Sequence, residues 1–191
     1  MSNISKIVKS IDDLRKNKEV VVVAIDGRAA SGKTTAAFDV SNRLEDKAAV
    51  VHMDHFFLPF ELRTAKRFET PGSNFHYERF KEEVLPCLHS GKSFDYGKFD
   101  CKIMDYAENI KIREYDVIIV EGAYSLHPIL GDYADLKIFL DVDAEEQMRR
   151  IEKRNGVENA KTFKERWIPL EEEYFKHYGI REKAHMILSQ N

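Results

Sequence analysis

The sequence predicts an α/β fold with a mostly parallel sheet, because continuous apolar segments alternate with segments of helical periodicity. The 191 residues are 43% hydrophobic and 33% charged, a composition typical of a globular domain and unlike that of disordered chains. A glycine-rich motif of phosphate-binding type follows directly after the first apolar segment, where a strand is expected to lead into a helix.

Five continuous apolar segments predict the strands. Runs rich in β-branched residues are typical of strands buried on both faces, as in parallel sheets. The expected strands are Val20–Ile25, Ala48–Met53, Val117–Val120, Leu136–Leu140 and, with the weakest pattern, Ala184–Leu188.

Apolar residues at helical spacing predict the helices between and around these strands. The first is N-terminal, with Ile4, Ile7, Val8, Ile11 and Leu14 on one face. The others are Thr34–Leu44, Tyr77–His89, Ala144–Asn155 and Thr162–Tyr178.

Residues 55–112 interrupt this alternation with aromatic residues, glycines and short alternating pieces such as Ser93–Phe99. We expect a long insertion that is partly helical and partly a hairpin and that lies over the carboxyl edge of the sheet. Ligands bind at that edge in open α/β sheets, so the insertion is expected to select the substrate.

Charge and cysteine content argue against several classes of protein. The 33 acidic and 30 basic residues give a net charge of −3, which argues against a broad nucleic-acid surface. Cys87 and Cys101 are the only cysteines, too few for a disulfide framework or a structural zinc site. Charges break every apolar stretch of residues 1–18, which argues against a signal peptide or membrane span. We expect a cytoplasmic protein without membrane or nucleic-acid partners; its oligomeric state stays open.

A complete G-x-x-x-x-G-K-[ST] motif predicts an ATP site. Its residues, with the threonine that follows, are Gly27, Arg28, Ala29, Ala30, Ser31, Gly32, Lys33, Thr34 and Thr35. Glycines let successive N–H groups turn toward phosphate oxygens, and the helix that follows adds its positive dipole end. Lys33 is expected to reach the β- and γ-phosphates, and the Thr34 hydroxyl to bind Mg²⁺.

Acidic residues at two strand ends are expected to complete the magnesium site. Mg²⁺ keeps most of its waters and is usually bound through one or two carboxylates and substrate phosphates. Glu121 directly follows the apolar run 117–120, as the acid of a Walker B element does, and Asp54 follows the second strand. Asp54 can also accept the proton of an acceptor hydroxyl, so we predict it as both catalytic base and metal ligand.

Six segments resemble the uridine kinase and phosphoribulokinase family of P-loop kinases. They are Asp26–Thr35, Met53–Pro59, Asn74–Phe80, Glu121–Tyr124, Tyr133–Lys137 and Arg166–Glu171, in family order over most of the chain. The resemblance implies a three-layer P-loop NTPase fold of the nucleoside-kinase type with a five-stranded parallel sheet. It also implies ATP as donor, typically to the 5′-hydroxyl of uridine or cytidine, with Asp54 as base and Glu121 bound to Mg²⁺ through water.

The resemblance further implies a lid at about residues 145–160 that carries arginines. Arg150 and Arg154 are four positions apart and share a helix face, where they can contact the transferred phosphate. The alternative for Arg150 is an ordinary surface ion pair with Glu146. His76, where relatives often carry an acid, is predicted to contact the substrate together with Tyr77 and Tyr124.

These observations predict a single domain over residues 1–191 that acts as a Mg²⁺- and ATP-dependent small-molecule kinase. Two alternatives stay open. One is a kinase of the same fold that acts on another acceptor, such as pantothenate or a sugar phosphate. The other is a regulatory module that binds ATP without phosphorylating an acceptor. The preference for ATP over GTP is also left open.

Overall fold

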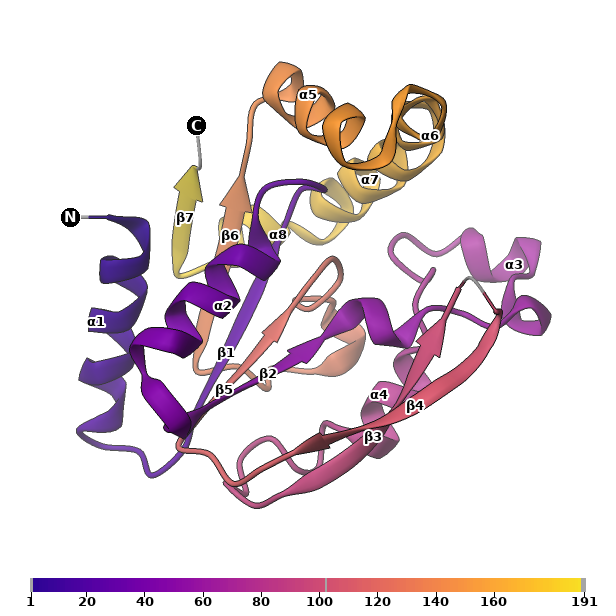
Figure 1. Ribbon diagram of the computed structural model, residues 1–191. Coiled ribbons are helices and arrows are strands. Elements are labelled where there is room, and N and C mark those ends of the chain that lie inside the picture. The colour runs from indigo at the N-terminus through magenta and orange to yellow at the C-terminus, as the bar shows by residue number, and fades with distance from the viewer. Residues whose placement is uncertain (1, 102, 190–191) are drawn as a thin grey trace.

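The structure, a computed structural model, describes residues 2–101 and 103–189. Five parallel strands form the central sheet in the order β2-β5-β1-β6-β7 (Figure 1). Their bounds are β1 Val21–Gly27, β2 Ala48–His52, β5 Val117–Glu121, β6 Leu136–Asp141 and β7 Met186–Ser189. All five predicted strands are present, and the predicted fold class is confirmed.

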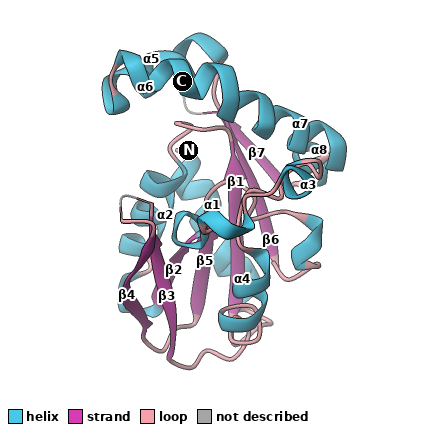
Figure 2. Ribbon diagram, turned by 90° about the vertical axis from the view of Figure 1, so that its right-hand side faces the viewer, coloured by secondary structure: helices cyan, strands magenta, loops and turns pink. Residues whose placement is uncertain are grey.

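Helices cover both faces of the sheet, which produces three layers (Figures 1 and 2). One face packs against α1 (Asn3–Arg15) and α2 (Lys33–Arg43). The other packs against α4 (Tyr77–Glu83), α7 (Ile168–Tyr178) and α8 (Ile180–Lys183). Side chains of β1 alternate between the two resulting cores. Every position of β1 is buried. A strand that is covered on both faces favours apolar side chains at successive positions, which explains the continuous apolar run in the sequence.

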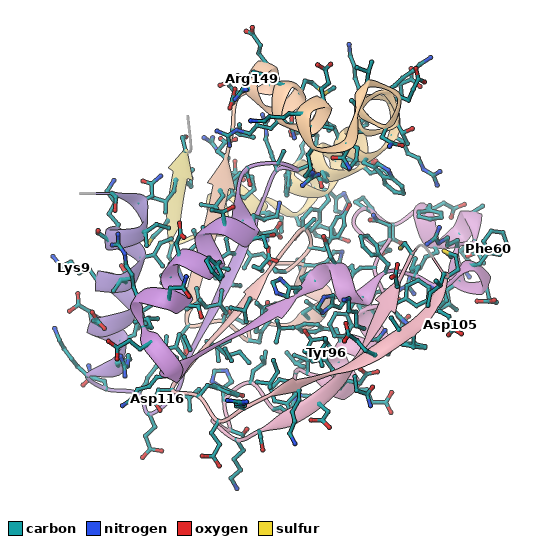
Figure 3. The ribbon with its side chains drawn as sticks, viewed as in Figure 1. Lys9, Phe60, Tyr96, Asp105, Asp116 and Arg149 are labelled. Carbon is teal, nitrogen blue, oxygen red and sulfur yellow. The ribbon has the colours of Figure 1, made fainter. Side chains whose placement is uncertain are left out.

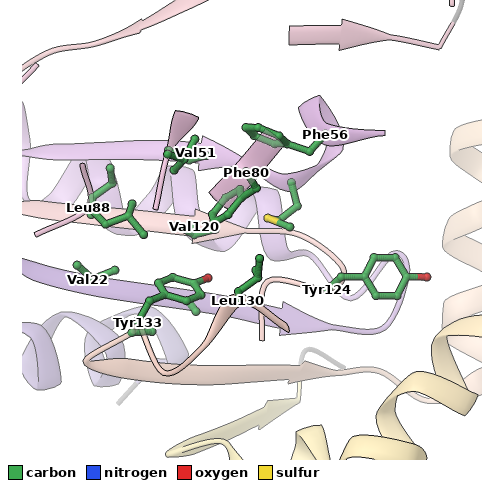
Figure 4. Packing of buried hydrophobic residues seen from close by; sticks show 14 of the residues in the cluster. Val22, Val51, Phe56, Phe80, Leu88, Val120, Tyr124, Leu130 and Tyr133 are labelled. Atoms are coloured by element: carbon green, nitrogen blue, oxygen red, sulfur yellow. The ribbon is translucent and has the colours of Figure 1, made fainter. Parts of the chain in front are cut away.

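The insertion shares the second of these cores. The Phe56 ring lies edge-to-face on Phe80, with centroids 5.2 Å apart, and stacks on Tyr96 at 5.3 Å. Figure 4 shows Phe56 and Phe80 beside Val51 and Val120 of the sheet. The aromatic residues of the insertion therefore anchor it to the sheet, while its outer parts stay free to shape a site.

The insertion contains short helices followed by a hairpin. Its elements before α4 are the 3₁₀ turns η2 (Met53–Phe56) and η3 (Phe60–Leu62) and the helix α3 (Ala65–Phe68). The expected hairpin consists of β3 (Phe94–Asp100) and β4 (Asp105–Ile112), paired antiparallel. The predicted helix Tyr77–His89 is too long, since α4 ends at Glu83. Pro86 explains the early end, because it has no N–H and disfavours helical geometry in the preceding residue.

Residues 144–167 lie above the carboxyl edge of the sheet (Figure 2). The helix α5 (Ala144–Asn155) has its predicted bounds. Asp143 caps its N-terminus, because the Asp143 side chain accepts from the Glu146 N–H at 2.9 Å. The predicted helix Thr162–Tyr178 is divided: α6 (Val157–Thr162) leads into a π-helical turn (Phe163–Trp167) before α7. Pro169 in the first turn of α7 accounts for the division. We call residues 144–167 the lid.

Two further 3₁₀ turns complete the described elements, η1 (Glu45–Lys47) and η4 (Pro128–Leu130). Among the described residues, every helix is too short or too polar to cross a bilayer.

Candidate active site

A cleft of about 990 Å³ opens at the carboxyl ends of β1, β2 and β5. Its walls come from the loop between β1 and α2, the residues after β2 and β5, the insertion and the lid. In Figure 3, Arg149 marks the lid helix α5 and Phe60 marks the outer end of the insertion. Predicted site residues in the lining are Ala29, Ala30, Gly32, Lys33, Thr34, Thr35, Asp54, Glu121, Tyr124, Arg150 and Arg154.

The loop from Gly27 to Gly32, which we call the phosphate loop, needs glycine at its start. Gly27 has φ +140°, and a Cβ there would lie 2.0 Å from the carbonyl oxygen of Leu140 in β6. Gly32 has φ +90° and caps α2, which has no acidic residue in its first turn. The N-terminus of α2 is therefore open to an anion, and its dipole favours one.

Lys33 lies across the phosphate loop. Its Nζ donates to the carbonyl oxygens of Gly27, at 2.7 Å, and Arg28, at 2.8 Å. The Arg28 side chain points elsewhere and is absent from the described cleft lining. Its Nε lies 2.9 Å from Glu172 Oε1, and a terminal nitrogen donates to the Val142 carbonyl oxygen. Lys33 thus bonds within the phosphate loop, and Arg28 connects that loop to the residue after β6 and to α7. Phosphate contact by Lys33 stays a prediction.

Thr34 and Glu121 lie together, as expected for two residues around one metal. The Thr34 hydroxyl donates to both carboxylate oxygens of Glu121 at 3.2 Å. His52, paired with Glu121 in the register of β2 and β5, has Nδ1 2.5 Å from Glu121 Oε1. Sequence reasoning missed this contact of His52, because the register between two strands cannot be read from the sequence of either strand alone.

The donor set around Glu121 fits Mg²⁺. Hydroxyl and carboxylate oxygens are the ligands that this ion prefers, and it takes the rest from phosphates and water. Among the described residues, no group of three or more acidic, histidine or cysteine side chains is placed to hold a metal.

Asp54 lies in η2 and is exposed to the cleft. The surrounding walls limit its hydration and raise its pKa, and the nearby Glu121 carboxylate raises it further. The charges of Lys33, His52 and Arg154 oppose this change. A carboxylate whose pKa is raised toward neutrality is better suited to accept a proton from a substrate hydroxyl.

The tip of the phosphate loop is held by two buried side chains that sequence reasoning did not assign to the site. Glu171 of α7 accepts from the Ala29 N–H at 2.9 Å, and Gln147 of α5 donates to the Ala29 carbonyl oxygen at 3.1 Å. Burial raises the pKa of Glu171 to about 7. Glu171 lies in Arg166–Glu171, one of the six segments that resemble the kinase family, and this is the only feature of the sequence that points to it. No feature of the sequence points to Gln147.

The two predicted lid arginines lie in the cleft in different ways. Arg150 forms the ion pair with Glu146, at 2.6 Å, and also donates to the Ala30 carbonyl oxygen at 3.3 Å. Arg154 is exposed, and its Nε donates to the Asn155 side chain at 2.8 Å. Arg150 thus contacts the phosphate loop, and the surface-pair interpretation of Arg150 holds at the same time. Arg154 lines the cleft with its guanidinium 5.8 Å from the Phe163 centroid.

Of the three predicted substrate residues, Tyr124 alone is among the described residues that line the cleft. Tyr124 lines the cleft, and its ring stacks on Phe75 with centroids 5.7 Å apart. Neither His76 nor Tyr77 is among the described lining residues. The Tyr77 ring instead lies under the Arg67 guanidinium, 3.9 Å away. Substrate contact by His76 and Tyr77 stays a prediction.

Comparison with known proteins places the chain near uridine kinases. Uridine kinase-like protein 5 of Arabidopsis thaliana is 34% identical over 152 residues, which are 75% of this chain and 32% of the relative. Uridine kinase of Clostridium botulinum (strain Kyoto / Type A2) is 29% identical over 158 residues, 76% of this chain and 73% of the relative. The chain thus spans about a third of the plant relative's length. No family model matches the chain.

Solved structures support the fold. A possible uridine kinase from Bacillus stearothermophilus superposes with a TM-score of 0.74 at 20% identity, over 97% of this chain and 96% of the other. D-glycerate 3-kinase from Cryptococcus neoformans gives 0.66 at 16% identity, over 99% and 96%. The resemblance to uridine kinases and the P-loop fold expected from the motifs are confirmed.

Proposed function

We propose that this chain, a P-loop fold protein similar in sequence to uridine kinases, transfers the γ-phosphate of ATP to a hydroxyl group of a small molecule. The observation that carries the proposal is the shared cleft of the phosphate loop, the Thr34 and Glu121 pair, and Asp54. Phosphoryl transfer needs mainly positioning and charge stabilisation, and these residues supply both.

In the proposed reaction, the acceptor oxygen attacks the γ-phosphorus of ATP, the bond to the β,γ-bridging oxygen breaks, and ADP leaves. Asp54 takes the proton of the acceptor hydroxyl. Lys33 and the phosphate-loop amides hold the phosphates, and Arg150 and Arg154 stabilise the transferred group. Mg²⁺, held beside Thr34 and Glu121, would neutralise phosphate charge. We place this activity in the cytoplasm, where cysteines stay reduced.

The names of the sequence relatives make uridine and cytidine the reference acceptors, and pantothenate and sugar phosphates are the alternatives on the same fold. The test is incubation with Mg²⁺-ATP and each acceptor, with the phosphorylated product identified by mass. ADP release without any phosphorylated acceptor would contradict the proposal and favour a regulatory ATP-binding module.

Lys33→Ala is expected to lower kcat/KM by about 10²-fold or more, because it removes a charge that contacts the transferring phosphate. Steady-state kinetics with the accepted substrate measure this loss. Lys92→Ala removes an exposed lysine that does not line the cleft and should keep full activity. Equal activity of both variants would remove Lys33 from the mechanism.

Asp54→Asn is expected to lower kcat by about 10²- to 10⁴-fold while ATP binding changes little, since the amide cannot accept the proton. Single-turnover assays and ATP titration separate the two effects. Asp95→Asn, at an exposed position of β3, is the control. Unchanged turnover of Asp54→Asn would exclude Asp54 as the base.

A further inference from the structure

We propose that the acceptor carries an oxyanion, either a carboxylate or a phosphate monoester, and that Arg63 and Arg166 bind it at the side of the cleft away from the phosphate loop. The inference rests on the proposed kinase function. The proposed function leaves several acceptors open, and the inference selects those that carry an anionic group.

The ionisable groups of the cleft are unevenly distributed. The described lining residues with carboxylates are Asp54, Glu121 and Glu171, all beside the strand ends or the phosphate loop. Among the other cations of the lining, Lys33 and Arg150 donate to phosphate-loop carbonyl oxygens, and the charge of Arg154 acts on Asp54. Beyond Asp54, the described lining residues of segments 57–104 and 163–167 include Arg63 and Arg166 and no carboxylate. In the proposed function ATP and Mg²⁺ would occupy the cleft beside Lys33 and Glu121, whereas Arg63 and Arg166 have no ion pair among the described residues.

Arg63 is positioned to bind an oxyanion. Its Nε donates to the Leu58 carbonyl oxygen at 2.9 Å, which fixes the guanidinium, and one terminal nitrogen lies 3.9 Å from the Met104 sulfur. Within the described part of the chain, no carboxylate forms an ion pair with it. Arg67, four residues later, differs: both of its terminal nitrogens bond to Glu78, at 2.6 and 3.0 Å. Arg63 therefore keeps donors for a planar oxyanion, which guanidinium groups bind well.

Arg166 approaches the same region from the lid. Its guanidinium lies 5.9 Å from the centroid of Phe68, in α3 of the insertion, and 4.8 Å from that of Trp167. Aromatic rings orient a guanidinium without neutralising it. No ion pair of Arg166 occurs among the described residues. Arg166 thus contacts α3 from the lid, and Arg63 lies in the insertion two residues before α3.

Cys101 connects this region to the proposed base. Burial raises the pKa of the Cys101 thiol, and smaller effects come from the charge of Arg63 and its hydrogen bond to the thiol, and then from the Asp100 and Asp54 carboxylates. Cys101 also lines the cleft, so Arg63 and Asp54 belong to one continuous wall. An acceptor can therefore place its hydroxyl at Asp54 and its oxyanion at Arg63. Both arginines are exposed in the cleft, so an anionic group of the acceptor gains a charge-assisted contact that a neutral acceptor lacks.

The test compares acceptors in pairs that differ in charge. Pantothenate is paired with neutral pantothenyl alcohol, and fructose 1-phosphate with fructose; uridine serves as the neutral nucleoside. We expect the anionic member of at least one pair to have a kcat/KM about 10- to 100-fold above its neutral partner and above uridine, from one charge-assisted contact. The pair that responds distinguishes a carboxylate from a phosphate.

Arg63→Ala should then raise KM for the anionic acceptor by about 10- to 100-fold, with little change in kcat or in KM for ATP. Arg63→Lys should recover part of the loss. Arg113→Ala, an exposed arginine beyond the hairpin and outside the described lining, should change neither KM. Thermal unfolding of each variant confirms that it is folded.

Two results would overturn the inference while the kinase function stands. One is a neutral acceptor, uridine included, that is phosphorylated as well as any anionic one. The other is an Arg63→Ala variant that is unchanged or that weakens neutral and anionic acceptors equally. If no acceptor in the panel yields a phosphorylated product, the proposed function itself fails, and the inference fails with it.

Discussion

Glu171 shows how one buried carboxyl group can control the geometry of a loop that binds phosphate. Its acceptor oxygen fixes the Ala29 N–H, and its side chain has almost no contact with water. Burial disfavours the charged form, so the folded protein holds this proton to about pH 7, well above the ordinary value of 4.5. A neutral Glu171 is also more compatible with phosphate binding in the same cleft than a charged one.

Glu171→Gln is expected to stabilise the protein more at high pH than at low pH. Because the folded pKa is raised, the folded state binds more protons than the unfolded state between about pH 4.5 and 7, so wild-type stability falls as pH rises through that window. Glutamine removes this loss and keeps an acceptor for the Ala29 N–H. The difference in unfolding free energy should grow to at most about 3 kcal/mol above pH 7.

Urea unfolding at several pH values measures this difference. Glu173→Gln, at an exposed neighbouring position, serves as the control and should show a small difference that does not vary with pH. A Glu171→Gln effect that is constant from pH 4.5 to 8 would contradict the assigned cause.

At the scale of elements, the start of the phosphate loop depends on how closely β1 approaches β6. Gly27→Ala would place a methyl group 2.0 Å from the Leu140 carbonyl oxygen at φ +140°, so the strands must separate. We expect a loss of at least about 3 kcal/mol. Gly156→Ala has a similar backbone constraint, φ +80°, but no atom within 4 Å of the added group, and should cost about 1 kcal/mol. Equal midpoints in urea would show that the contact with β6 is unimportant.

The lid elements differ from the strands in how deeply they are buried. Among the described core clusters, α6 contributes one buried residue, Ala160, which packs with Ala29 and Ile151. By contrast, every residue of β1 and β5 is buried. Segments with few buried contacts open locally without global unfolding. Amides of α6 are therefore expected to exchange hydrogen at least about 10²-fold faster than those of β1, measured by mass spectrometry. Equal protection would mean that the lid unfolds only with the sheet.

For the whole molecule, the features that could be predicted are those that depend on residues close together in the sequence. Apolar runs identified the five strands, and the parallel sheet brings Thr34 and Glu121 to one edge because the carboxyl ends of its strands lie there. The contacts of His52, Gln147 and Glu171 could not be predicted in this way. Gln147 and Glu171 both reach Ala29, from positions more than 100 residues later, and only the folded chain determines such pairs. The placement of Arg63 and Arg166 in one cleft is of the same kind, since one comes from the insertion and the other from the π-helical turn.

The carbonyl oxygen of Ala29 is hydrogen-bonded to α5, and its N–H is hydrogen-bonded to α7. These two bonds limit how chimaeric enzymes can be built. A lid grafted from a relative onto this sheet would lose the glutamine and, if the graft includes α7, the glutamate that fix the loop tip. A loop grafted alone would meet partners shaped for another backbone. Exchange of substrate-closing segments between such proteins should therefore succeed only when the loop, α5 and α7 are transplanted as one unit.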